Sequence, residues 1–224
     1  MSNINVLKRD GTIEDLNLEK VHKMVEFAVE GLAGVSASQV EIQSGLQFCD
    51  GIKSSDIQEI LIRSASDLIS EEHPNYQYVA ARLLLFGLRK AVHGHPEILP
   101  PLLEHVKGCI DKGVYDGTIV NRYSEEEWDR IDSFVDHERD YLFTYAGLRQ
   151  VVDKYLVQDR SSGEHYESPQ QMYIMISATL FANYPKETRL DYVRRYYNAI
   201  STHKINIPTP IMGGVRTPLS LIHI

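Results

Sequence analysis

Cysteine is scarce in this chain of 224 residues, and its scarcity excludes several kinds of site. The two cysteines, Cys49 and Cys109, lie far apart and form no C-x-x-C pair. Cysteine-based zinc sites and disulfide frameworks need more cysteines at closer spacing, so neither is indicated. We expect two buried, reduced thiols, because a free cysteine usually behaves as a small apolar residue.

An excess of basic residues and long apolar runs are also lacking. The chain has 23 lysines and arginines against 31 aspartates and glutamates, which gives a net charge of −8. A partner such as nucleic acid or an anionic membrane needs a basic face, so we expect neither. A small anionic ligand held by a local cluster of cations is still compatible with this balance. Because the sequence shows no cleavable signal and no apolar run that could cross a bilayer, we expect a cytoplasmic protein.

The first part of the chain carries the signals of a small domain, which we place at residues 1–93. Asp10-Gly11 lies between short β-rich runs and predicts a hairpin over residues 3–16. Asn17 is placed to cap a helix whose apolar face includes Leu18, and a later helix has Ile69 facing inward. Four helices are expected in all, through residues 18–32, 40–48, 54–69 and 74–93.

A proline-rich linker at residues 94–101 separates this domain from a mostly helical second part at 102–218. A second hairpin is expected around residues 160–163. Short helices are expected from residue 124 and over 145–155, and long helices near 169–182 and 187–203. After them the sequence predicts an extended run over residues 208–218, in which Gly213 and Gly214 form a turn.

Cations near the first hairpin suggest a site for a triphosphate, which needs several positive charges and the unpaired N–H groups of a helix start. The charges come from Lys8, Arg9, Lys20 and Lys90, and Ser54 begins a helix. Glu14 and Asn17 suit the base or the ribose of a nucleotide. From spacing alone the alternative is stronger, namely that these are solvated surface charges, because no glycine-rich phosphate loop is present.

Several segments resemble a known family, the large subunit of class Ia ribonucleoside-diphosphate reductase. Residues 6–11, 16–21, 50–57 and 74–90 resemble the ATP-cone, its regulatory domain. The resemblance continues through residues 137–140, 154–157, 184–189 and 208–218, in the order expected for that subunit. It implies a mainly α (α+β) fold, in which the ATP-cone is followed by the helical N-terminal part of the ten-stranded α/β-barrel reductase domain.

The same resemblance implies that ATP and dATP, with magnesium, bind the cone as regulators of overall activity. Together with Arg9, the residues to which it assigns this site are Lys8, Glu14, Asp15, Leu16, Asn17, Leu18, Glu19, Lys20, Ser54, Ile57, Gln58 and Lys90. Relatives that dATP inhibits often carry histidine where this chain has Gln58 and Gly87. We therefore expect ATP binding but little inhibition by dATP.

The resemblance assigns Thr209 to the site for the ribonucleoside diphosphate substrate. It also implies that this chain holds no catalytic residue, because the radical cysteine and the dithiol pair are expected beyond it. The partners it implies are a small radical-generating subunit and a second large subunit, and it implies no metal bound by this chain. Similarity stops after Pro218, so we expect residues 219–224 to be non-native and the chain to be an inactive N-terminal fragment. The alternatives are a stand-alone nucleotide-binding regulatory module and one half of a split reductase.

Overall fold

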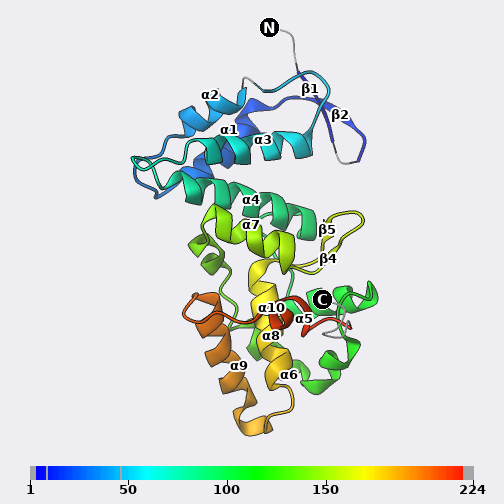
Figure 1. Ribbon diagram of the computed structural model, residues 1–224. Coiled ribbons are helices and arrows are strands. Elements are labelled where there is room, and N and C mark those ends of the chain that lie inside the picture. Colours follow the sequence, from blue (N-terminus) through cyan, green and yellow to red (C-terminus); the bar gives the residue numbers. More distant parts are fainter. Residues whose placement is uncertain (1–3, 9, 46, 219–224) are drawn as a thin grey trace. The chain divides into compact units, whose positions relative to one another are not determined.

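The computed structural model describes residues 4–8, 10–45 and 47–218, which form two compact units (Figure 1). The first unit comprises Met1–Gly87 with Phe143–Arg149, and the second comprises the rest of the chain. The fold is mostly helical with a small sheet near the N-terminus, which confirms the predicted fold class. The border between the first domain and the linker, which the sequence predicts after residue 93, stays a prediction.

The first unit begins with the predicted hairpin. Strands β1 (Asn5–Leu7) and β2 (Ile13–Asp15) pair antiparallel, with Leu7 opposite Ile13. The turn forms because the Asp10 carboxylate accepts hydrogen bonds from the Thr12 amide and hydroxyl, while Gly11 takes a positive φ of 84°. A third strand, β3 (Ile52–Lys53), pairs parallel with β1 and was not predicted.

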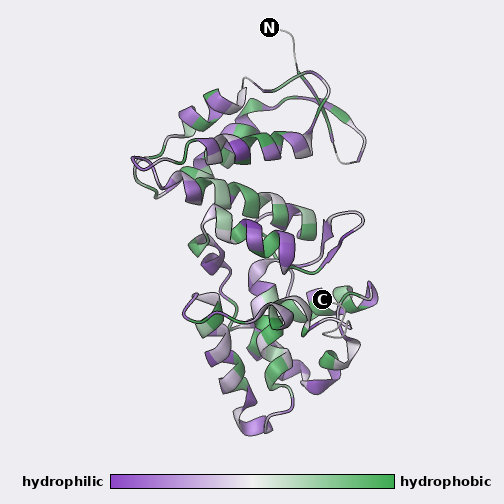
Figure 2. Cartoon of the chain, viewed as in Figure 1, coloured by the Kyte–Doolittle hydropathy of each residue, from purple (hydrophilic) through white to green (hydrophobic). Residues whose placement is uncertain are grey.

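Four helices complete this unit, as predicted: α1 (Leu18–Val29), α2 (Ala37–Gly45), α3 (Ser54–Asp67) and α4 (Tyr76–His93), the last of which continues into the second unit. Their core consists of fully buried aliphatic side chains such as Val25, Leu61 and Val79. Figure 2 shows α4 coloured mostly as hydrophobic, in keeping with its run of leucines. Helix α2 ends three residues short of the predicted end at Phe48.

Two side chains predicted to face inward are exposed instead. Leu18 is 65% exposed and Ile69 is 40% exposed. Leu18 is the first residue of α1, and Ile69 lies just beyond the end of α3. Apolar periodicity identifies the buried face of a helix. At the end of a helix, however, that face can extend beyond the neighbouring helices and strands that would bury it.

The second unit is built around α8 (Pro169–Phe181), which is buried over its first ten residues. It packs against α9 (Lys186–Ser201), and α9 is tied to α6 (Glu125–Asp132) by the ion pair between Arg189 and Glu127. Glu127 also closes a capping box with Ser124, where the sequence predicts the start of a short helix.

The remaining elements of this unit are short. Helix α7 spans both units. They are α5 (Leu102–Asp111), the 3-10 helices η1 (Gly117–Arg122) and η2 (His137–Leu142), α7 (Tyr145–Lys154), the predicted second hairpin of β4 (Gln158–Asp159) and β5 (Glu164–His165), and α10 (Thr209–Gly214).

Helix α10 corrects the prediction of an extended run at residues 208–218. Pro208 is the extended N-cap residue, and Pro210 lies in the first turn. A first-turn residue needs no N–H partner within the helix, so proline is tolerated there. Gly213 and Gly214 are the last helical residues, and neither has a positive φ. Two prolines spaced in this way therefore begin a helix here.

The expectation of two buried thiols is half wrong. Cys109 is buried on α5, whereas Cys49 is exposed in the segment between α2 and β3. A short connecting segment has no second layer to cover its side chains. Among the described residues, no helix is long and apolar enough to cross a membrane.

Candidate functional site

The first candidate site lies at one end of the three-stranded sheet. Because β1 and β3 are parallel and Leu7 is paired with Lys53, the residues that follow them, Lys8 and Ser54, leave the sheet side by side. Lys8 Nζ lies 3.1 Å from Glu14 Oε2 on β2, and both side chains are partly exposed. The sheet thus brings together three of the residues predicted to bind the nucleotide.

Two helix starts adjoin these strands. The amide of Lys20 donates a 3.0 Å hydrogen bond to Asn17 Oδ1, so the predicted cap of α1 is confirmed. At the start of α3 the N-cap residue is Lys53, which provides no side-chain cap. The first amides of a helix have no partner within it and carry a partial positive charge. The start of α3 beside Lys8 is therefore suited to an anion.

Gln58 and Ile57 face the core of the first unit. Ile57 is buried, and Gln58 Nε2 donates a 2.7 Å hydrogen bond to the Leu83 carbonyl on α4. A Cβ built on Gly87 would lie 3.1 Å from Gln58 Cγ, so the absence of a side chain at residue 87 makes room for Gln58. The amide that the resemblance assigns to the nucleotide is already bonded within the protein.

The other predicted residues of this site are more dispersed. Glu19 pairs with Lys23 on the surface of α1, 2.8 Å away, and Lys20 is exposed. Leu16 donates its amide to the Ile4 carbonyl, and Asp15 is paired with Asn5 in the sheet. Lys90 lies in the last turn of α4, in the second unit, and Arg9 lies outside the described residues.

A hollow of about 250 Å³ also lies in the first unit, between α1 and α2. It includes Leu18 from the predicted set, together with His22 and Glu41, which are 2.6 Å apart. The hydrogen bond that His22 donates to the Glu41 carboxylate raises the pKa of His22. The described residues that line this hollow include no lysine or arginine, so they do not offer a triphosphate the charges that it needs.

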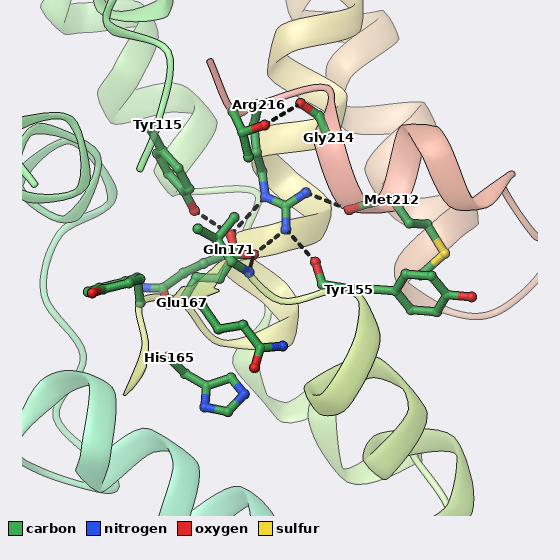
Figure 3. A network of polar contacts seen from close by, with 12 residues as sticks. Tyr115, Tyr155, His165, Glu167, Gln171, Met212, Gly214 and Arg216 are labelled. Atoms are coloured by element: carbon green, nitrogen blue, oxygen red, sulfur yellow. Dashed lines mark hydrogen bonds and ion pairs between the residues drawn. The ribbon is translucent and has the colours of Figure 1, made fainter. Parts of the chain in front are cut away.

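The second candidate site is centred on Thr209, at the start of α10. Thr209 is exposed, and its Oγ1 lies 3.4 Å from the hydroxyl of Tyr155. Behind them lies an ion pair between Arg216 and Glu167, both fully buried (Figure 3). Arg216 Nε donates a 2.8 Å hydrogen bond to Glu167 Oε2, and Nη2 pairs with Oε1.

Glu167 has two further partners. The Val157 amide donates a 2.7 Å hydrogen bond to Oε1, and the Tyr115 hydroxyl donates to Oε2. Burial raises the pKa of Tyr115 well above its ordinary value, so this phenol stays protonated and remains a donor. This network was not predicted from the sequence, because Tyr115, Glu167 and Arg216 are far apart in the chain.

Comparison with known proteins finds a matching family model for part of each unit. Residues 4–91 match the model of the ATP cone domain, and residues 141–220 match that of the ribonucleotide reductase all-alpha domain. The chain combines an ATP-cone with a ribonucleotide reductase all-alpha domain. The resemblance drawn from the sequence motifs is thereby confirmed.

Whole-chain comparisons agree with these matches. The chain is 54% identical over 95% of its length to the ribonucleoside-diphosphate reductase subunit alpha of Haemophilus influenzae. It is also 54% identical over 96% of its length to the ribonucleoside-diphosphate reductase 1 subunit alpha of Escherichia coli. It is 41% identical over 97% of its length to the subunit alpha of Enterobacteria phage T4. In each case the chain spans 28% of the length of the relative.

Proposed function

We propose that this ATP-cone binds ATP, with magnesium, at the end of the sheet formed by Lys8, Glu14 and the start of α3. The binding regulates a ribonucleoside-diphosphate reductase, which converts ribonucleoside diphosphates to deoxyribonucleoside diphosphates. The observation that carries the proposal is the parallel pairing of β1 with β3, since it places a lysine beside the unpaired amides of a helix start. Both features favour phosphate oxygens.

The energetics are sufficient for this role. A charge-assisted hydrogen bond contributes about 1.5–3 kcal/mol, and micromolar binding needs about 8 kcal/mol. Lys8 and a few helix-start amides therefore supply most of what is needed, and Asn17 and Glu14 are available for the ribose or the base. The Lys8–Glu14 contact does not oppose this, since both side chains are partly exposed and a surface ion pair is weak.

Calorimetric titration of the chain with magnesium ATP tests the proposal. Lys8→Ala should weaken binding about 10- to 100-fold, as expected from the loss of one charge-assisted bond. Lys23→Ala is the matched control, because Lys23 is an exposed lysine of the same unit that pairs with Glu19 on α1. Absence of binding heat, or equal effects of the two substitutions, would reject the site.

We further propose that Thr209 contacts the ribonucleoside diphosphate in the complete large subunit. That subunit would act as a homodimer and receive its radical from a small subunit. The match of residues 141–220 to the all-alpha domain favours this role over a stand-alone regulatory module. A cytoplasmic location stays a prediction.

We expect dATP to inhibit such an enzyme only weakly. Gln58 is bonded to the Leu83 carbonyl, and Gly87 provides no imidazole. Residues 1–93 grafted onto a full-length relative that dATP inhibits should make that relative insensitive. Strong inhibition of the graft at micromolar dATP would contradict the expectation.

A further inference from the structure

A second hydroxyl accompanies Thr209, and it comes from a distant part of the sequence. Tyr155 directly follows the end of α7, whereas Thr209 is the first residue of α10. Their side-chain oxygens lie 3.4 Å apart. This is long for a hydrogen bond between two hydroxyls, which is usually about 2.7–2.8 Å. The two hydroxyls therefore satisfy each other poorly and keep hydrogen-bonding capacity for a ligand.

One buried side chain holds both residues in place. Arg216 Nη2 donates a 3.0 Å hydrogen bond to the carbonyl of Tyr155, and Nη1 donates a 2.6 Å hydrogen bond to the carbonyl of Met212. Met212 belongs to α10, the helix that Thr209 begins. The rigid, planar guanidinium thus bridges the backbone of Tyr155 and the helix that carries Thr209.

The surroundings of Arg216 prevent it from moving. The guanidinium is bonded to Glu167, which is itself held by the Val157 amide and the Tyr115 hydroxyl. Neither charge reaches solvent, and separating a buried ion pair is strongly unfavourable. Figure 3 also shows the Met212 side chain pointing toward the ring of Tyr155.

We propose that Tyr155 is a second substrate-binding hydroxyl beside Thr209, and that Arg216 is the positioning residue that sets their spacing. The inference rests on the proposed role of Thr209. Two adjacent hydroxyls that can donate suit the phosphate oxygens or ribose hydroxyls of a ribonucleoside diphosphate. The oxygen of Thr209 and that of Tyr155 would bind the same group or neighbouring groups of the substrate.

The test uses a complete large subunit, obtained by placing residues 1–218 of this chain in the Haemophilus influenzae subunit and adding that organism's small subunit. Reduction of CDP gives KM and kcat. Tyr155→Phe and Thr209→Val should each raise KM about 2- to 10-fold, the effect of losing one hydrogen bond. Tyr166→Phe is the matched control, since the Tyr166 hydroxyl also has a loose 3.4 Å contact, with Glu164. It should leave KM unchanged.

Each outcome has a distinct meaning. If Thr209→Val raises KM and Tyr155→Phe does not, the inference is wrong while the proposed role of Thr209 stands. If neither raises KM, the proposed role of Thr209 is itself wrong. An increase for Tyr166→Phe as large as that for Tyr155→Phe would also overturn the inference.

The positioning role of Arg216 needs its own variants. Arg216→Lys keeps the charge but cannot bridge two carbonyls, so KM should rise while the secondary structure measured by circular dichroism is retained. If this variant fails to fold, the double variant Glu167→Gln with Arg216→Gln removes both buried charges together and should also raise KM. A folded variant, single or double, with an unchanged KM would overturn the positioning role.

Discussion

Gln58 and Gly87 should be energetically coupled, and the structure gives the size of the coupling. Alanine is favoured over glycine within a helix by about 1 kcal/mol, so Gly87→Ala should stabilise α4 by that amount. The new Cβ would lie 3.1 Å from Gln58 Cγ and would push that side chain away. The 2.7 Å hydrogen bond from Gln58 to the Leu83 carbonyl would then weaken, at a cost of about 1 kcal/mol. We therefore expect Gly87→Ala alone to be nearly neutral.

Removal of Gln58 should reveal the stability that Gly87→Ala adds to α4. In a Gln58→Ala background no side chain opposes the new methyl group, so Gly87→Ala should stabilise the first unit by about 1 kcal/mol. The coupling free energy in the double-mutant cycle should likewise be about 1 kcal/mol, within the range typical of residues in contact.

Urea unfolding of the chain and its three variants provides the measurement. Far-UV circular dichroism follows the helices, while fluorescence of Trp128, the chain's single tryptophan, follows the second unit. Trp128 is 1% exposed, so its signal should change when that unit unfolds. If Gly87→Ala raises the free energy of unfolding equally with and without Gln58, the two residues are independent and the reasoning fails.

Two further predictions concern the second unit and the cysteines. Burial lowers the pKa of His93, His105 and His137 to about 4, so they stay neutral in the folded chain and gain protons on unfolding below pH 6.5. The free energy of unfolding should therefore fall as the pH drops from 6.5 to 4, by up to about 4 kcal/mol per pH unit. Urea titrations in which the free energy of unfolding does not change with pH over this range would contradict the prediction. Exposed Cys49 should react with a thiol reagent in the native chain, whereas Cys109, buried and with its pKa raised to about 12, should react only after unfolding. Two fast-reacting thiols in the native chain would refute this.

Local signals in the sequence predicted the structure well. The Asp10-Gly11 turn, the cap at Asn17 and the helix start at Ser124 all form as expected. Each of these depends on hydrogen bonds between residues at most three apart, so the chemistry is complete within a short segment. The same holds for the start and approximate length of most helices.

Features that depend on distant partners were not predicted. Strand β3 is two residues long and exists only because β1 is available to pair with it. Arg216 and Glu167 are charged residues in a sequence where charge usually indicates the surface, yet both are fully buried because each neutralises the other. The helical form of residues 209–214 likewise contradicted a local interpretation of the prolines.

The Lys8–Glu14 pair explains how one carboxylate can serve two roles at the proposed nucleotide site. A partly exposed ion pair contributes about 0–1 kcal/mol, whereas a charge-assisted bond from lysine to phosphate contributes about 1.5–3 kcal/mol. A triphosphate should therefore displace Glu14 from Lys8 with a net gain. The released carboxylate then lies on β2, close to the helix start capped by Asn17, and is able to accept hydrogen bonds from a ribose. We expect Glu14 to hold Lys8 in the absence of nucleotide and to contact the ligand in its presence, so that the sheet supplies both the cation and the group that masks it.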